Sequence, residues 1–305
     1  MSLKTISEKI QDSHSAYILC LSLLFIFAFS VPLIFAFTVG GAIGRYSKDI
    51  QSSGTIIIEE QEKHEKDKVF PLSINITGPN SYLSVETSSA IEPASDKDFF
   101  LYIWLKLRRL PAEGERLILL SKFDERSASR RGYSLALSGE REAVRPEVYW
   151  RDENNNGTWF TFSELDASAR TWTLFALSFR QGRYLGLHAA TINSESDYPL
   201  KLPDIKLLGG YELPEIIIPT ANSDLLVGAF GGGRFRGRMG PIGIFHTSSL
   251  TRKLDEILQH IVSDSRTLPD AIERREVGLW IIDGHEDKSS AANKVKFTKS
   301  RAIED

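Results

Sequence analysis

The sequence predicts an all-β domain of two antiparallel sheets packed as a sandwich, with one transmembrane helix before it and one short helix near the C-terminus. From Val69 onward, apolar and polar residues alternate in short runs separated by clusters of Gly, Pro, Asn and Asp, which is typical of half-buried strands. No helical periodicity intervenes between these runs, so strand–helix repeats and a parallel sheet are excluded. Residues 17–43 carry no charge.

The uncharged segment predicts a membrane anchor. Its 27 residues would form a helix longer than the roughly 30 Å hydrocarbon core of a bilayer. A cleaved signal peptide is the alternative, because a small-residue cleavage site can be drawn after Ala42 with Gly40 before it. The apolar regions of signal peptides span only about 7 to 15 residues, so we expect an uncleaved anchor that contacts the lipid bilayer through residues 17–43.

The flanking charges leave the orientation of this anchor almost balanced. Lys4 and Lys9 precede the segment, and Arg45 and Lys48 follow it. The free amino terminus adds a positive charge on the short side, and residues 1–16 carry no domain. We therefore expect a single-pass protein of the cell membrane, with the N-terminus in the cytoplasm and the domain periplasmic or extracellular.

Three small residues within the segment indicate a helix–helix contact. Ala36, Gly40 and Gly44 are spaced four apart, which places them on one helix face where another helix backbone can approach closely. Such spacing also occurs by chance in many spanning helices. The prediction is an interface with another membrane protein at these three positions.

Composition limits the remaining possibilities. The net charge of −3 and the isoelectric point near 6.1 give no electrostatic reason to expect nucleic acid as a partner. The only cysteine, Cys20, lies in the apolar segment, so the domain has no disulfide and no thiolate metal site. The domain must be stabilised by its core.

The chain divides into five parts by composition. Residues 1–16 are a leader and 17–43 the transmembrane helix; 44–68 are a charged linker ending in EEQEKHEKDK, 69–265 are the β-sandwich, and 266–305 are a C-terminal extension. The extension holds an apolar stretch at 277–282 that can add a strand to a sheet edge. From Lys288 we expect either a flexible tail or an arm ordered by a partner.

Within the sandwich, the strands and the helix follow from periodicity. Residues 172–179 are apolar on both faces, which predicts a strand in the middle of the sandwich. After Ser248 or Ser249, either of which can cap a helix, the i, i+4, i+7 spacing from Leu250 to Ile261 predicts a helix with one buried face. The predicted strands are 72–76, 82–86, 99–107, 116–122, 133–138, 147–151, 159–163, 171–179, 184–190, 225–229 and 239–246.

Several motifs in this order resemble a known family. They are SINITGPNSYLSVETSSAI, DFFLYIWLKL, LILLSKFDERSASRRGYSLAL, TWTLFALSF with GRYLGLHA, and LLVGAFGGGRFRGRMGPIGIFHTSSLTRKLDEI. Together they are similar to the concanavalin A-like, laminin G-type jelly roll of the bacterial kind, over about residues 70–262. The resemblance implies a jelly roll of two antiparallel sheets closed by a strand and a short helix.

No catalytic motif accompanies this resemblance. Glycosidases of this fold carry an E-x-D-x-x-E pattern on one strand, because hydrolysis needs two carboxylates, and that pattern is absent. The sequence also lacks G-x-S-x-G, H-E-x-x-H and a phosphate loop, and its histidines are scattered. We predict that the protein is not an enzyme.

One metal pattern is half complete. Asp152, Asn154 and Asn156 precede Gly157 as D-x-N-x-N-G, the first half of a calcium loop, but position 163 is Ser where the loop needs an acid. The alternative is an Asn-Gly turn joining strands 147–151 and 159–163. These three residues are thus candidate ligands of a calcium ion, and no other cofactor is predicted.

Two functions remain. The first is a membrane-anchored interaction subunit whose domain docks on a partner protein or a larger membrane complex, and the sequence favours it because of the small residues, the long tail and the missing catalytic groups. The alternative is a cell-surface carbohydrate-binding module, motivated by the resemblance and by Tyr149, Trp150, Trp159 and Trp172. Tyr149 and Trp159 are the candidate ligand-binding residues.

Overall fold

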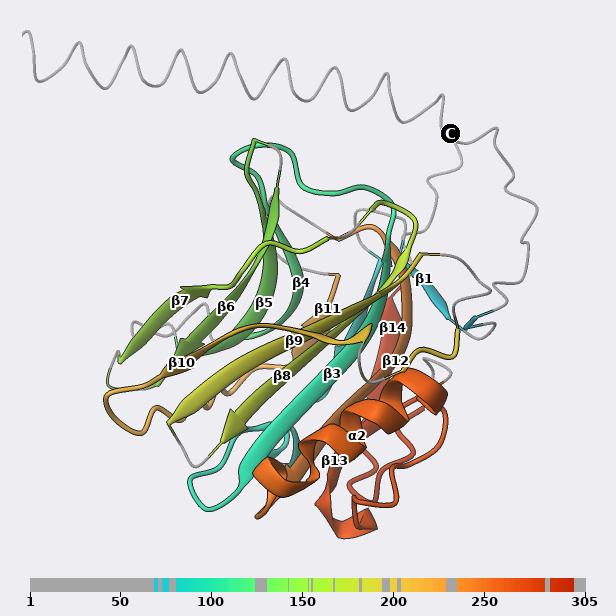
Figure 1. Ribbon diagram of the computed structural model, residues 1–305. Coiled ribbons are helices and arrows are strands. Elements are labelled where there is room, and N and C mark those ends of the chain that lie inside the picture. Colours follow the sequence, from blue (N-terminus) through green and yellow to red (C-terminus); the bar gives the residue numbers. More distant parts are fainter. Residues whose placement is uncertain are drawn as a thin grey trace, which may run out of the picture. The chain divides into compact units, whose positions relative to one another are not determined.

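The computed structural model describes the β domain and most of its C-terminal extension (Figure 1). Residues 1–68, and with them the predicted anchor and Ala36, Gly40 and Gly44, lie outside the described residues. In the part that is described, no helix is long and apolar enough to cross a membrane. The described residues are 69–70, 73–76, 81–123, 131–141, 143–152, 154, 156–166, 168–180, 183–193, 198–201, 204–228, 235–282 and 286–298.

The domain is a sandwich of two antiparallel sheets, as the sequence predicts. Sheet A has the strand order β1 (Ile74–Ile76), β12 (Gly237–Thr247), β3 (Asp98–Leu107), β8 (Trp172–Arg180), β9 (Tyr184–Ile192) and β10 (Lys206–Glu212), with β13 (Val277–Ile281) also paired to β12. Sheet B has the order β14 (Val295–Thr298), β2 (Tyr82–Val85), β11 (Leu225–Val227), β4 (Arg116–Phe123), β5 (Gly132–Gly139), β6 (Val144–Arg151) and β7 (Gly157–Thr161). The helical elements among the described residues are two short 3-10 helices, η1 (Ser89–Ile91) and η4 (Arg274–Glu276), and helix α2 (Leu250–Asp264).

The core lies between the sheets and is formed by every second residue of each strand. In β8, Phe175, Leu177 and Phe179 face this core. From sheet B, Trp150 meets Phe179 with ring centroids 4.7 Å apart, and its indole N–H donates to the Ile217 carbonyl at 3.0 Å. Trp150 is therefore a core residue whose polar group is satisfied, which stabilises the sandwich.

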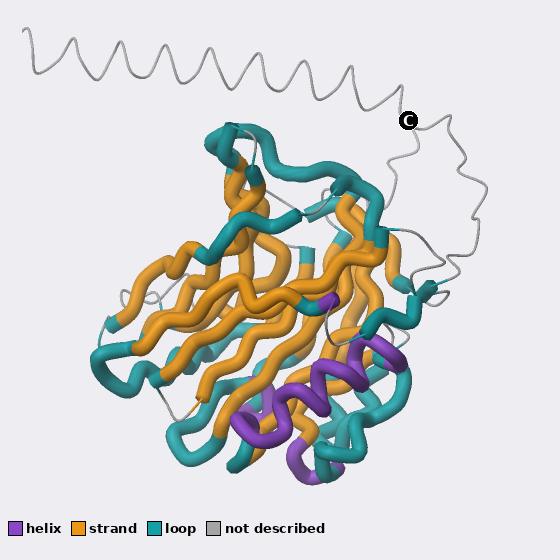
Figure 2. The backbone as a smooth tube through the Cα atoms, viewed as in Figure 1, coloured by secondary structure: helices purple, strands orange, loops and turns teal. Residues whose placement is uncertain are grey.

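A second apolar layer covers the outer face of sheet A. The alternate residues of β3 and β8, among them Trp104 and Trp172, form a buried cluster with the apolar side of α2. Figure 2 shows the purple helix lying against the orange strands of this sheet. The buried helix residues are Leu250, Leu254, Ile257, Leu258, Ile261 and Val262. The predicted helix and the two-faced burial of β8 are thus confirmed.

The start of α2 differs from the prediction in its cap. Ser249 stands at the N-cap but makes no side-chain capping hydrogen bond. Instead, the Asp98 carboxylate accepts a hydrogen bond from the Leu250 backbone N–H at 3.1 Å. A long-range acid from β3 thus satisfies one of the free donors of the first turn.

The C-terminal extension contributes one strand to each sheet. β13 pairs with β12, as the apolar stretch at 277–282 allowed. After it, the Asp287 carboxylate accepts hydrogen bonds from backbone and side-chain groups of Ser289 and Asn293, at 2.7 to 2.9 Å. The segment from Lys288, expected to be a tail or a partner-ordered arm, leads into β14, which pairs with β2 of the same chain.

Strand β7, at the edge of sheet B, is held against sheet A by aromatic contacts. The Tyr211 ring on β10 lies 5.1 Å from Phe160 and 5.3 Å from Phe162. Tyr211 also donates its hydroxyl to the Thr161 carbonyl, and the Ser163 N–H donates to the Leu208 carbonyl at 2.9 Å. Because Phe160 faces inward, its neighbour Trp159 must face outward.

Candidate functional site

The candidate site is a cavity of about 350 Å³ on the outer face of sheet B. It lies over strands β4, β5, β6 and β7, on the side that faces away from the core. The strand register places Tyr149 opposite both Trp159 of β7 and Ser134 of β5. The residues that line the cavity are Ile118, Phe123, Ser134, Tyr149, Arg151, Gly157, Thr158 and Trp159.

Three aromatic rings, together with Ile118, form the apolar part of this cavity. Tyr149 and Trp159 have ring centroids 5.3 Å apart, and Phe123 meets the Tyr149 ring edge-on at 5.1 Å. Tyr149 is only 8% exposed and forms the floor, whereas Phe123 and Trp159 are half-buried at its sides. The cavity therefore offers ring surface to a ligand from more than one direction.

A half-buried ion pair supports Trp159. The Arg116 guanidinium lies 4.3 Å from the centroid of the Trp159 ring. Its Nε is 2.6 Å from Oε2 of Glu147, and Oε1 of the same carboxylate accepts a long hydrogen bond from the Thr161 hydroxyl at 3.5 Å. Glu147 is buried, so this pair fixes the arginine over the ring.

The hairpin between β6 and β7 depends on one glycine at the cavity wall. Gly157 has a φ of +98°, and a Cβ atom at this position would overlap the carbonyl oxygen of Trp150. Only glycine adopts this conformation at low cost in a close-packed turn. Gly157 is one of the residues that line the cavity.

The predicted calcium residues form the loop of the same hairpin. One oxygen of Asp152 accepts hydrogen bonds from the backbone N–H groups of Asn154 and Asn156, both at 2.9 Å, and the other accepts from the Asn156 amide at 3.2 Å. This is the geometry of an Asx-type turn. In the described part of the chain, no group of three or more His, Cys, Asp or Glu side chains could hold a metal. Calcium stays a prediction.

Of the four aromatic residues considered in the sequence, two meet at the cavity and two do not. Tyr149 and Trp159 are neighbours across the β6–β7 pair. Trp150 is in the core, and Trp172 is 2% exposed and packs under the α2 layer against Phe70, with centroids 4.8 Å apart. The sequence reasoning also missed Phe123, Arg116 and Ser134, which only the pairing of β4 and β5 with β6 brings to the same face.

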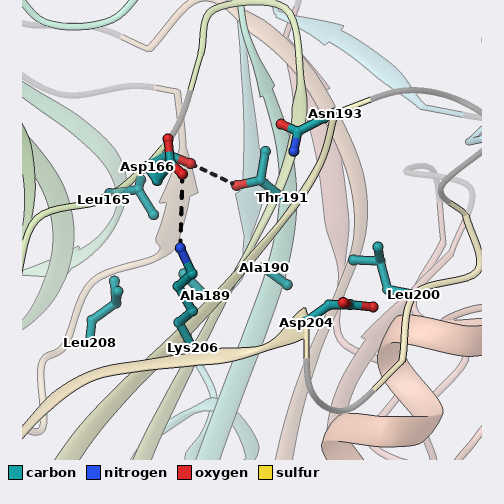
Figure 3. A pocket seen from close by; sticks show the side chains of 10 residues that line it. All are labelled: Leu165, Asp166, Ala189, Ala190, Thr191, Asn193, Leu200, Asp204, Lys206 and Leu208. Carbon is teal, nitrogen blue, oxygen red and sulfur yellow. Dashed lines mark hydrogen bonds and ion pairs between the residues drawn. The ribbon is translucent and has the colours of Figure 1, made fainter.

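A second cavity, of about 490 Å³, lies between the end of β9 and the start of β10 (Figure 3). Its lining combines aliphatic side chains with polar ones. Across it, Asp166 faces Lys206 at 3.9 Å, and the Asp166 backbone carbonyl accepts a hydrogen bond from the Thr191 hydroxyl at 3.4 Å. Both charged side chains are largely exposed. No aromatic ring is among the described residues that line it, which are Leu165, Asp166, Ala189, Ala190, Thr191, Asn193, Leu200, Asp204, Lys206 and Leu208.

No family model matches the sequence, and no curated protein matches it. Solved structures align with it at low similarity. The binding domain of Paraclostridial Mosquitocidal Protein 1 is 12% identical over 64% of this chain and 48% of its own, with a TM-score of 0.42. The Botulinum neurotoxin serotype D ligand binding domain, in complex with N-acetylneuraminic acid, is 10% identical over 64% and 43%, with a TM-score of 0.43.

A third structure is the CBM40 of the Ruminococcus gnavus IT-sialidase, bound to α2,3-sialyllactose, which is 11% identical over 58% of this chain and 90% of its own, with a TM-score of 0.39. The chain spans about half the length of the first structures that it matches. At these TM-scores, the alignments carry no argument about ligand or activity. The sandwich itself rests on the strand pairing of this chain, and the finer resemblance to the laminin G-type family stays a prediction.

Proposed function

We propose that the domain is a carbohydrate-binding module that takes a sugar unit into the cavity formed by Phe123, Tyr149 and Trp159. The observation that carries the proposal is the meeting of these three rings at one outward-facing cavity. Aromatic side chains in strands are normally buried, and here Trp150 lies in the core between the sheets and Trp172 lies under the α2 layer. The rings of Phe123, Tyr149 and Trp159 instead lie on the outer face of sheet B, where a ligand can reach them.

The chemistry of the cavity suits a sugar. A pyranose ring presents C–H groups on its faces and hydroxyl groups at its edge. The Tyr149 and Trp159 rings supply surfaces on which the C–H faces can stack, while Ser134, Thr158 and Arg151 bring polar groups to the same cavity. A mainly apolar cavity with a few convergent polar groups is the usual form of a small-molecule site.

This proposal reverses the preference that the sequence suggested. The interaction-subunit hypothesis depends on residues 17–43 and on Ala36, Gly40 and Gly44, all of which lie outside the described residues. The carbohydrate hypothesis depends on Tyr149 and Trp159, which the strand register brings together. Display of the module on a membrane, outside the cytoplasm, is kept as part of the proposal because of the apolar segment.

The proposed role is binding without hydrolysis. Glu147 is the carboxylate beside the cavity, and it is engaged by Arg116 and Thr161. Hydrolysis of a glycosidic bond needs a proton donor and a second carboxylate at a suitable distance. None of the eight described residues that line the cavity carries a side-chain carboxyl group.

The test is a glycan array followed by calorimetry on the full chain purified in mild detergent. We expect at least one saccharide to bind, and Trp159→Ala to weaken it by about tenfold or more, which corresponds to about 1.4 kcal/mol. Tyr184→Ala is a matched control, because Tyr184 also carries an arginine over its ring, at 4.1 Å, on the other sheet. It should leave the affinity for an uncharged sugar unchanged.

Two results would contradict the proposal. One is an empty array together with an empty polysaccharide pull-down. The other is equal sugar affinity in the wild type and Trp159→Ala. If the array is empty and a membrane protein co-purifies with the chain in constant ratio, the interaction-subunit hypothesis replaces this one.

A further inference from the structure

A separate cavity of about 460 Å³ lies on sheet A, where β8 ends, β9 begins and α2 starts. The strand register brings these ends together, because Phe179 of β8 pairs with Phe99, while Asp98 pairs with Thr247 just before the helix. The lining residues are Arg180, Arg183, Tyr184, Glu212, Leu213 and Thr251. The cavity is thus independent of the aromatic one on sheet B.

Two arginines dominate the charge of this cavity. The Arg180 guanidinium lies 4.1 Å from the centroid of the Tyr184 ring, and its buried Nε has no hydrogen-bond partner. Arg183 is exposed at the turn that joins the two strands. In the described part of the chain, neither arginine side chain forms an ion pair, and neither does the carboxylate of Glu212. The lining therefore holds two cations and one anion.

The start of α2 borders the same cavity. Thr251 belongs to the first turn of a 15-residue helix that has no acidic residue in that turn and no side-chain cap from Ser249. The N-terminal end of a helix carries a partial positive charge, but here the Asp98 carboxylate accepts a hydrogen bond from the Leu250 N–H at 3.1 Å and offsets that charge. The two guanidinium groups therefore supply most of the positive charge at this cavity.

We propose that this Arg180–Arg183 cavity binds a tetrahedral oxyanion, a phosphate or sulfate group that is either free or carried on a larger ligand. Guanidinium groups present their N–H donors in a planar fork that matches the oxygens of such an anion. The stacking of Arg180 on Tyr184 holds one fork in place before binding. Glu212 is the one lining group that opposes an anion, and its carboxylate limits the affinity.

His188 provides a reporter for occupancy. It lies on β9, and burial, followed by the charge of Arg180, lowers its pKa to about 4, with Asp255 of α2 acting in the opposite direction. An anion bound at Arg180 neutralises part of the positive charge that His188 experiences. Binding should therefore raise the pKa of His188.

The experiment titrates the full chain with inorganic phosphate, inorganic sulfate and glucose 6-phosphate, by calorimetry and by following the His188 imidazole proton resonance. Arg183→Gln should weaken phosphate binding by about tenfold. Glu212→Gln should strengthen it by about two- to fivefold, because a like charge is removed. Arg145→Gln, which removes an arginine paired with Glu140 at 3.1 Å on sheet B, should change nothing.

The opposite signs of the two variants separate a site from general attraction to positive charge. If glucose 6-phosphate binds more tightly than inorganic phosphate in Trp159→Ala as well as in the wild type, the ligand is an ester; equal binding in Trp159→Ala would identify the free oxyanion. The proposal is overturned if Arg183→Gln and Arg145→Gln weaken binding equally, if Glu212→Gln has no effect, or if saturating phosphate leaves the His188 titration unchanged.

Discussion

The outer faces of both sheets carry aromatic side chains, which are buried on sheet A and line an open cavity on sheet B. On sheet A, Trp104 and Trp172 are 0% and 2% exposed because α2 and the chain around Phe70 cover them. On sheet B, Trp159 is half-buried, stacks against Tyr149 and Arg116, and lines a cavity. An outward-facing aromatic side chain becomes part of the core where another layer covers the sheet, and a candidate binding group where none does.

The two faces differ because the segment that follows β12, the last long strand of sheet A, folds back and covers the outer face of that sheet. The chain leaves β12 and forms α2, whose six buried residues lie over β3 and β8. Burial of a large apolar side chain contributes about 1.5 to 3 kcal/mol. We therefore expect the aromatic residues of sheet A to govern stability and those of sheet B to govern ligand affinity.

The largest expected effect comes from Trp104. Trp104→Ala removes a fully buried indole under the α2 layer and should lower the free energy of unfolding by about 3 to 5 kcal/mol, measured by urea denaturation. Trp104→Phe should lower it far less, because the indole N–H has no hydrogen-bond partner to lose. Trp159→Ala should lower it by less than about 1.5 kcal/mol. Equal losses for Trp104→Ala and Trp159→Ala would remove the distinction between the faces.

An intermediate effect involves pH and the His188 side chain, which lies on the helix-covered side near Asp255 of α2. Its pKa is lowered from 6.5 to about 4 in the folded protein. Between these values the unfolded chain binds a proton that the folded chain does not, so stability falls as the pH falls through this window. The loss should be about 2 to 3 kcal/mol.

The matched variant is His188→Gln, which cannot titrate. Its unfolding free energy should depend less on pH between 6.5 and 4 than that of the wild type, in parallel urea titrations at each pH. Carboxylates elsewhere contribute the same background to both proteins. Identical pH profiles for the two proteins would show that protonation of His188 is not coupled to unfolding.

Much of the fold follows from local patterns, and its exceptions have physical causes. Alternation predicted the long strands, and the spacing of Leu250, Leu254 and Ile257 predicted α2. Strand β10 was missed because Gly209 and Gly210 interrupt its alternation and its register shifts between Leu207 and Gly209. Strand β14 was missed because it is short and lies in a charged segment, where pairing with β2 rather than propensity decides its conformation.

The candidate site could be predicted only in part. Tyr149 and Trp150 are adjacent, so strand geometry requires that one faces the core and the other faces outward. Local sequence cannot say which face is the core, because that depends on the pairing of β6 with β5 and on Phe179 across the sandwich. Phe123 and Arg116, both on β4, join the cavity region through the same long-range register.

The smallest expected effect concerns Arg116 on the outer face of sheet B. Substitutions at this position test whether the arginine acts by holding the Trp159 ring in place or by its charge. Arg116→Lys keeps a cation near Glu147 but loses the planar group that stacks on Trp159 at 4.3 Å. We expect a stability loss below about 1 kcal/mol, as for a partly exposed ion pair, and sugar binding weaker by about two- to fivefold. If Arg116→Lys and Arg116→Gln weaken binding equally, the arginine acts by holding the ring. If only Arg116→Gln weakens it, the arginine acts by charge, and the ring of Trp159 needs no support to bind.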